Sequence, residues 1–413
     1  MILIFVFLSI TLFFTEDIFA QCTSPTGAAG QIQWMSPDLN FCRGTSWRVL
    51  RSDVQAGTCS PAGRIQYNSG VLQVCNGSNW KTFQILATTG GCTTQGAFRY
   101  VAGGPRIEYC DATGWRPIND VLCTPGTQTF TSAGVTAFAV PSGCSSLIVK
   151  AWGAGGGSGS SYDNTSGAGG GGGFASADLT VTGGENLNIY VGGGGQGNQK
   201  PNGNDGSGGG GGGGGYSGIF RSTTPLVVAA GGGGGGGADD GGTAGRGGAG
   251  GGASGTAGAG TNGGGGGGPA AGGTFNDCSG SYTGPTGGSS LQGGVGENGR
   301  NGGYVGAGGT NGGGAGGASG TDYDDEIAGG GGGGGGYFGG GGGCRNDPGR
   351  GGGGGSSYAT GTTPVLTSGA NSAVANSGDA DYVANTGNGA AAVSGQTRGN
   401  NGQPGAVWVS WSE

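Results

Sequence analysis

Alternation of apolar and polar residues first becomes regular in three similar stretches that follow residue 20. The middle stretch alternates through "RIQY" and "VLQVC", with "NSG" between them, and "NGSN" then leads into "WKTF". Period-two segments separated by turn residues are typical of antiparallel strands. We therefore predict that each stretch is a three-stranded meander of about thirty residues.

Cysteine and tryptophan recur at fixed offsets in these stretches, which indicates an internal repeat. Each copy holds two cysteines, and a tryptophan follows the second cysteine by five residues. We place the copies at 21–56, 57–89 and 90–121. The tryptophans (Trp47, Trp80 and Trp115) have two interpretations, as core anchors or as ligand-stacking platforms, and we favour the core.

Such small units bury little apolar surface, so each copy is expected to need a disulfide. The predicted pairs are Cys22–Cys42, Cys59–Cys75 and Cys92–Cys110. A metal site is the alternative, but no two of these cysteines lie two to four residues apart, as paired metal ligands would.

From residue 122 onward, β-rich segments alternate with long glycine tracts. "TAFAV" and "LIVKAW" alternate around the turn "PSG", and further strand pairs are "GFASADLTV" with "NLNIYVGG" and "GYSGIF" with "PLVVAAGG". The segment "GAVWVSW" closes the chain. Because strands bracket the tracts on both sides, we expect the tracts to return to one sheet, which a linker would not need.

The glycine tracts themselves differ from flexible linkers, which are rich in serine. All but thirteen of the 118 glycines follow residue 123, many in pure runs. Polyglycine packs as extended helices of three residues per turn, related to the polyproline form. Ordering a residue costs roughly 1–2 kcal/mol and a backbone hydrogen bond returns about 1 kcal/mol, so such an array needs a clamp.

The remaining four cysteines supply that clamp and one further bridge. Cys278 and Cys344 are the cysteines within the glycine-rich tracts, and a bridge between them is worth on the order of 4 kcal/mol. We predict this pair, and we predict Cys123–Cys144 in the first hairpin. Ten cysteines in five disulfides indicate an oxidising compartment.

Residues 1–20 are mostly apolar and end in Ile18-Phe19-Ala20. A run this short predicts a signal peptide cleaved after Ala20 and not a membrane span. "FAQC" also resembles a lipoprotein cleavage box, but Gln21 is too large for one. We therefore expect a secreted or cell-surface protein that does not span a membrane.

Charge and composition exclude several functions. Charged residues make up 9% of the chain, the net charge is −7 and there is no histidine. Nucleic-acid binding needs a basic face, and histidine-dependent triads and His-ligated metals are impossible. We expect no catalytic residue, no cofactor and no metal.

Two weaker motifs remain open. The acidic run from Asp322 to Glu326 could ligate calcium, but its spacing fits no standard calcium loop, and we favour a solvated loop. Asn76 and Asn164 stand in glycosylation sequons.

Two resemblances add to this interpretation. The Cys/Trp copies resemble small repeats of bacterial and prophage surface proteins, which implies presentation at a surface. Residues 124–413 resemble the glycine-rich domain of the anaplastic lymphoma and leukocyte tyrosine kinase ectodomains, and of bacterial and phage glycine-rich surface proteins. The blocks that carry this match are "VPSGCSSLIVKAWGAGGG", "LNIYVGGGGQG", "GGGGYSGIFRSTTPLVVAAGGGG", "GGYFGGGGGC", "GGGGGSSY" and "GAVWVSW".

The second resemblance implies an all-β fold for 122–413, a tumour-necrosis-factor-like β-sandwich with polyglycine-II helices inserted between its strands. The kinase domains bind a protein cytokine, and phage adhesins carry receptor-binding loops on similar arrays. For this chain the resemblance implies recognition, without a particular ligand.

Our hypothesis is a secreted, non-enzymatic adhesin or recognition protein. It binds a surface protein or glycan on a host or neighbouring cell through loops on a rigid glycine-rich scaffold. We expect the contacts in two inserts that interrupt the glycine, around Phe275–Tyr282 and Thr321–Ile327. The candidate contact residues are Phe275, Tyr282, Asp322, Tyr323 and Asp324. The alternative is a structural matrix or filament protein assembled by polyglycine packing, and a hydrolase is a third candidate.

Overall fold

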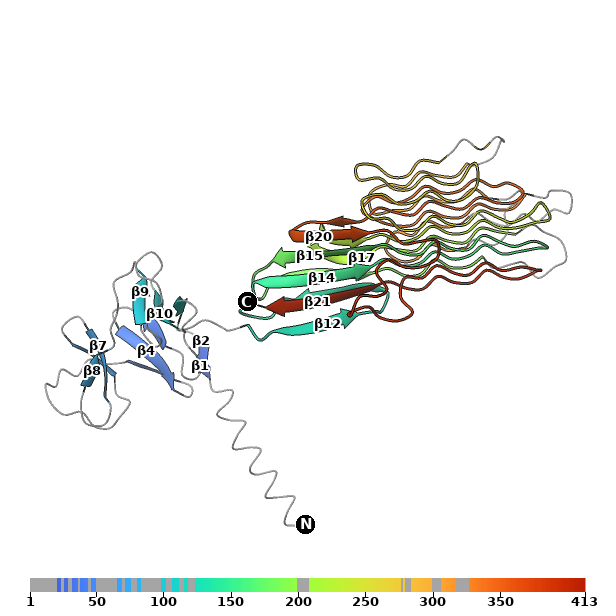
Figure 1. The fold of residues 1–413 in the computed structure, drawn as a ribbon. Helices are drawn as coiled ribbons and strands as arrows, with labels where there is room; N and C mark the ends of the chain where they lie inside the picture. The colour runs from blue at the N-terminus through green and yellow to red at the C-terminus, as the bar shows by residue number, and fades with distance from the viewer. Residues whose placement is uncertain are drawn as a thin grey trace, which may run out of the picture. The chain divides into compact units, whose positions relative to one another are not determined.

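The computed structural model describes strand residues within 21–117, and residues 123–198, 208–275, 278, 284–298, 306–316 and 327–412. The chain divides into two compact units, Met1–Val121 and Leu122–Glu413. The regular elements of the described residues are all strands (Figure 1). No described residues form a helix long and apolar enough to cross a membrane. The predicted signal peptide lies outside the described residues.

Each Cys/Trp copy contains a three-stranded antiparallel sheet, which confirms the meander prediction. The three sheets are β3 (Ile32–Met35), β4 (Asp38–Arg43) and β5 (Ser46–Val49); β6 (Ile65–Asn68), β7 (Val71–Cys75) and β8 (Trp80–Thr82); and β9 (Phe98–Val101), β10 (Arg106–Cys110) and β11 (Trp115–Pro117). A separate two-stranded pair, β1 (Gln21–Thr23) with β2 (Thr26–Ala28), precedes them.

The repeat extends to strand register. In every copy the second cysteine is opposite the tryptophan that follows it, as the pairs Cys42–Trp47, Cys75–Trp80 and Cys110–Trp115. Side chains of this unit lie outside the described residues, so its three disulfides and the role of its tryptophans stay predictions.

The second unit contains two five-stranded antiparallel sheets. The order of the first is β12-β21-β14-β15-β20 and that of the second is β13-β16-β17-β18-β19. The strands of the first sheet are β12 (Gly126–Phe130), β14 (Ser146–Trp152), β15 (Phe174–Thr180), β20 (Thr362–Thr367) and β21 (Ala406–Ser412). Those of the second are β13 (Gly134–Ala139), β16 (Asn186–Val191), β17 (Ser217–Arg221), β18 (Thr224–Ala229) and β19 (Tyr358–Ala359).

The core of this unit lies between the two sheets and follows from strand alternation. In β14, Leu147, Val149 and Ala151 are fully buried, while Ile148 on the other face is 43% exposed. Leu187 and Ile189 of β16 meet them from the second sheet in one apolar cluster. Full burial of one such aliphatic side chain stabilises the fold by about 1.5–3 kcal/mol.

The glycine-rich segments form a second body that extends from one end of the sandwich (Figure 1). We call it the glycine array; it consists of the described residues of 153–173, 192–215, 230–357 and 386–405. Its tracts are extended, run side by side, and are joined by backbone hydrogen bonds between tracts. The tracts are therefore folded, and the linker interpretation is wrong.

Hydrogen bonds in the array repeat every three residues. In the central tract, 231–237, every third N–H donates to the same neighbour, and the three neighbours are 329–335, 154–157 and 245–248. The carbonyl groups of the central tract accept from 211–214, 167–170 and 349–355. The donated and accepted bonds together are 2.7–3.1 Å long, so one tract is bonded to six neighbours without using a side chain.

Close approach of the backbones explains why the central tract is pure glycine. A Cβ added at any position of 231–237 would lie 1.9–2.2 Å from a neighbouring carbonyl oxygen. Outer tracts differ, because one side of each faces solvent: Thr256, Ala257 and Ala259 are all exposed. The position of a tract in the array thus decides which of its residues must be glycine.

Two disulfides are present in this unit, and both were predicted. Cys123–Cys144 joins the segment before β12 to the turn after β13, with a Cα–Cα distance of 4.5 Å. Cys278–Cys344 joins two segments of the array, with a Cα–Cα distance of 5.8 Å.

Candidate recognition surface at the end of the array

The tracts of the array run out from the sandwich, turn, and run back to it. The turns therefore lie at an end of the array that points away from the sandwich, which is its free end. After β14, residues 153–160 run outward, turn at 161–166, and return along 167–173 to β15; Gly153, Gly156 and Gly159 bond to the returning segment. The segment after β18 does the same around a turn at 239–244. The array therefore collects a set of turns at its end away from the sandwich.

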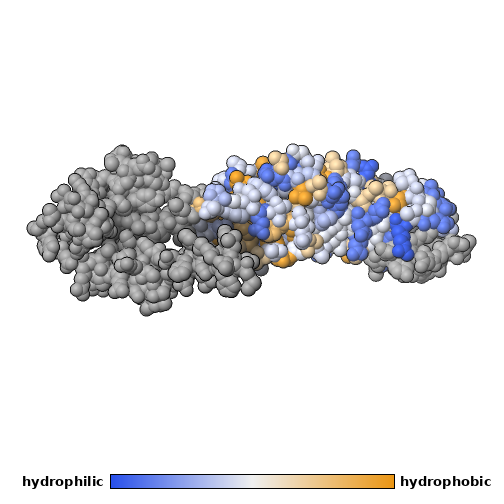
Figure 2. All heavy atoms as spheres, turned by 90° about the horizontal axis from the view of Figure 1, so that it is seen from below, coloured by the Kyte–Doolittle hydropathy of each residue, from blue (hydrophilic) through white to orange (hydrophobic). Residues whose placement is uncertain are grey.

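These turns are rich in polar residues, in contrast to the glycine tracts between them. The described turns at the free end are 161–166, 239–244, 260–262, 344–349 and 391–398, and they contain Asp, Asn, Ser, Thr and Arg. Figure 2 shows strongly hydrophilic residues gathered toward this end of the unit. We call these five turns the free-end surface.

Side chains tie neighbouring turns of the free-end surface together. Asn164 Nδ2 donates to the carbonyl oxygens of Asp239 (3.0 Å) and Asp240 (2.7 Å). The N–H of Gly241 donates to Asp347 Oδ1 at 3.0 Å. Burial raises the pKa of Asp347, with Asp240 adding to the rise and the Gly241 N–H opposing it. Three turns from distant parts of the chain are thus held in one arrangement.

The use of Asn164 bears on its sequon. Its amide nitrogen, the atom that a glycan would modify, already donates to two carbonyl oxygens. Attachment of a sugar would remove at least one of these bonds, so the fold favours the structural role of Asn164 over glycosylation.

A buried ion pair lies next to the Cys278–Cys344 disulfide. Glu297 is only 2% exposed; its Oε1 lies 3.3 Å from Arg345 Nε, and its Oε2 accepts the Arg345 N–H at 3.2 Å. Burial raises the pKa of Glu297 against the opposing effect of Arg345. This pair was not predicted, because Glu297 stands alone in a glycine-rich segment.

The same place holds the one group of possible metal ligands found among the described residues. The Sγ atoms of Cys278 and Cys344 and a carboxylate oxygen of Glu297 lie within 4.8 Å of one another. Both sulfurs are in a disulfide, and a metal needs thiolates. In this state the group is a covalent and ionic clamp on the array.

Of the five predicted contact residues, the structure describes one. Phe275 is 48% exposed. Tyr282, Asp322, Tyr323 and Asp324 lie outside the described residues. The first insert begins at Phe275, and the second is followed by Ala328, whose backbone bonds to Asn346 in the free-end turn 344–349.

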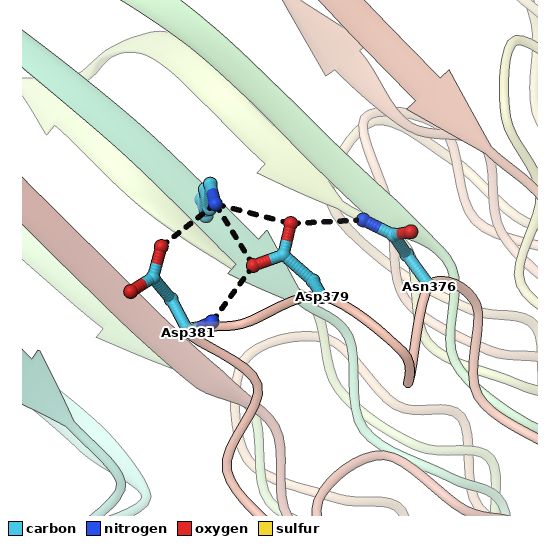
Figure 3. A network of polar contacts seen from close by, with 4 residues as sticks. Asn376, Asp379 and Asp381 are labelled. Atoms are coloured by element: carbon cyan, nitrogen blue, oxygen red, sulfur yellow. Dashed lines mark hydrogen bonds and ion pairs between the residues drawn. The ribbon is translucent and has the colours of Figure 1, made fainter.

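A second polar network lies on the outer face of the first sheet, away from the free end (Figure 3). Lys150 Nζ of β14 is 2.8 Å from Asp379 Oδ1 and 2.7 Å from Asp381 Oδ2, and it lies 5.3 Å from the ring centroid of Trp408. Asp379 also accepts bonds from the Asp381 N–H and from Asn376. The network fastens the segment 370–385 onto the sheet.

Burial and pairing act in opposite directions on these charges. Burial lowers the pKa of Lys150, but the hydrogen bonds to Asp379 and Asp381 outweigh it, and the pKa lies above its ordinary value. Burial likewise raises the pKa of Asp379, but Lys150, the Asp381 N–H and Asn376 together outweigh it, and that pKa lies below its ordinary value. Both groups are held in their charged forms, which suits a structural tether.

Aromatic side chains fix the junction between array and sandwich. Tyr337 stacks on Tyr358, with ring centroids 4.2 Å apart, and contacts Phe338 edge-on at 5.0 Å. Tyr337 belongs to the cluster of Tyr216, Phe220 and Val228 on the second sheet. The turn between the glycine runs 329–336 and 339–343 is thus held against the sandwich by an aromatic ring.

Comparison with known proteins finds no matching family model and no similar curated protein. Function must therefore be argued from this geometry. The free-end surface can present side chains from separate turns in a fixed arrangement. The array that supports it is held by backbone hydrogen bonds, so the motion of side chains does not loosen it.

Proposed function

We propose that this protein is a non-enzymatic recognition protein of the secreted or cell-surface class. Its free-end surface binds a protein or glycan on a host or neighbouring cell. The observation that carries the proposal is that the outward tracts end in polar turns tied together by Asn164, Asp347 and the Glu297–Arg345 pair. Loops on a rigid frame are a common device for recognition.

Rigidity of the support follows from the bonding of the array. A three-residue repeat and six bonded neighbours per tract are what a polyglycine-II lattice requires, and we assign the array to that form. We assign the sandwich to the tumour-necrosis-factor-like class on its two five-stranded antiparallel sheets. A turn held by such a support loses little conformational entropy on binding, which favours affinity.

Extracellular location is supported by the two disulfides, which persist in oxidising compartments. A binding role is supported by the exposure of Phe275 and of Asp163 and Asp240 near the free end. Exposed aromatic and acidic side chains suit contact with a sugar face or a polar protein surface.

The test is a binding screen of the mature chain on glycan and cell-surface protein arrays. The test variants are Asp163→Ala with Asp240→Ala, Phe275→Ser, and replacement of 321–326 by glycine and serine. The matched control is Val365→Ser on β20, which is equally exposed at 49% but lies on the sandwich.

We expect every hit to weaken in at least one of these test variants and to be unchanged in the control. Binding that survives all the test variants, or that is lost with Val365→Ser, would show that the contact surface lies elsewhere. Concentration-dependent filaments in place of specific binding would favour the structural alternative.

A further inference from the structure

Within the described residues of the second unit, both sheets end on the same side in a strand that has a neighbouring strand on one edge only. β12 is the last strand of the first sheet and β13 the last of the second, and only the turn 131–133 separates them in sequence. The rings of Phe130 and Phe138 meet between the two strands at 6.2 Å. Most residues of both strands are exposed.

The backbone of β13 offers hydrogen-bonding groups to solvent. The N–H of Val140 donates to Glu185 of the neighbouring β16 segment at 2.8 Å. Because backbone groups alternate along a strand, the N–H and C=O of Val135, Ala137 and Ala139 point away from β16. A row of outward N–H and C=O groups fits one kind of partner, an added β-strand that pairs with them.

The strands at the other side of the sandwich have features that oppose strand addition, and the strands β12 and β13 lack them. There β20 contains Pro364 and pairs with β15 through a bulge, and β19 is only two residues long. Proline, bulges, short strands and charges are the usual protection of sheet edges. β12 and β13 contain no proline, and the sequence has no charged residue from 121 to 149.

We propose that this side is a homodimer interface, in which a second copy of the chain adds its own edge strands and continues both sheets. A peptide would cover only one of the two edges, whereas a two-fold rotation presents two edges to two edges. The absence of charge favours a like partner, because two identical uncharged edges do not repel. Figure 2 views the unit from the side at which Figure 1 draws β12, and hydrophobic residues lie on the sandwich surface there.

Dimerisation would give the protein two free-end surfaces. Two linked sites raise the effective affinity for a surface with many copies of the ligand. This consequence rests on the proposed function, but the interface does not, so an oligomer measurement tests the interface alone.

The test is sedimentation velocity of the mature chain, from about 1 µM to about 100 µM. The variants are Ala137→Pro, which removes an outward N–H and no bond to β16, and Ala137→Lys, which adds an exposed charge. The matched control is Val365→Lys, an exposed position on β20. Near-UV circular dichroism and the melting temperature verify that each variant is folded.

We expect a dimer in the wild type and in Val365→Lys, and at least about a tenfold weaker dimer in both Ala137 variants. Amide exchange at Val135, Ala137 and Ala139 should slow as the wild-type concentration rises. A monomeric wild type, or a dimer that both Ala137 variants retain, overturns the proposal. A monomer that instead binds an extended peptide at this edge also overturns it, since the occupant is then not a second copy.

Discussion

At the scale of single residues, the array depends on what glycine lacks. A Cβ at Gly234 would lie 2.0 Å from the carbonyl oxygen of Gly211, and both backbones are fixed by bonds to further tracts. Nothing in that place can move aside, unlike the end of a flexible side chain. Elsewhere a glycine has no such constraint: at Gly378 an added Cβ meets nothing within 4 Å.

Gly234→Ala should therefore lower the free energy of unfolding by about 3 kcal/mol, as overpacking in a rigid interior does. Gly378→Ala should change the free energy of unfolding by less than about 1 kcal/mol. The change should be stabilising, because alanine restricts the unfolded chain more than glycine does. Chemical denaturation followed by tryptophan fluorescence measures both. Equal effects at the two positions would mean that the array yields locally to a methyl group.

The Lys150 tether gives a prediction with a defined dependence on pH. Asp379→Asn should lower the free energy of unfolding near neutral pH by about 1 kcal/mol, since the pair is partly exposed. Because the folded pKa of Asp379 lies below its ordinary value, its contribution is complete above the unfolded pKa and is lost as pH falls through the folded pKa. The raised pKa of Lys150 has the opposite sign, so its contribution is lost as pH rises through the folded value.

Urea titrations of wild type and Asp379→Asn, from neutral to strongly acidic pH, measure this difference. The two curves should converge in acid, and Ser377→Ala, a neighbouring change outside the network, should follow the wild type throughout. A difference that is constant across this range would mean that the aspartate acts through packing and not through its charge.

At the scale of elements, strands were predictable where one face of the strand is buried. "LIVKAW" alternates because Leu147, Val149 and Ala151 face the core, and it became β14. β20 was missed because five of its six residues are exposed, which leaves no alternation, and because Pro364 argues against a strand. The array was predicted as a lattice, but the order of its tracts was not, since glycine has no side chain to specify a neighbour.

The candidate site was less predictable for a related reason. The free-end surface brings together turns separated by long stretches of chain, such as Gly241 with Asp347, 106 residues apart. Lys150 and its partners are 229 and 231 residues apart. Neither contact produces a recognisable pattern among neighbouring residues in the sequence. The Cys278–Cys344 pair was predictable only because few cysteines remained to be paired.

The Cys278–Cys344 clamp should stabilise the element that it closes. Cys278→Ser with Cys344→Ser is expected to lower the free energy of unfolding by about 2–4 kcal/mol and to speed amide exchange across 329–343. Exchange mass spectrometry with the core strand β14 as internal reference measures the local part. Coil-like exchange of 329–343 in the oxidised wild type would contradict the folded array itself.

At the scale of the whole second unit, the array and the sandwich are joined by continuous backbone and by aromatic packing. Tracts continue strands without a break, as 153–160 continues β14, and the turn at Tyr337 packs on the aromatic cluster of the second sheet. The array has few apolar side chains of its own, and its hydrogen bonds return about as much free energy as ordering its glycines costs. Its persistence should therefore depend on the apolar core of the sandwich.

A core mutation far from the array tests this dependence. Leu147→Ala, at a fully buried position, should cost about 2–5 kcal/mol, and the array amides should lose protection together with those of β14 at the same lowered temperature. Ile148→Ala, on the exposed face of the same strand, is the matched control and should leave both transitions in place. Calorimetry combined with exchange mass spectrometry follows the two bodies separately. If the array stayed protected after the sandwich had melted, the lattice would be stable in its own right, and polyglycine packing alone would be enough to hold the free-end surface in place.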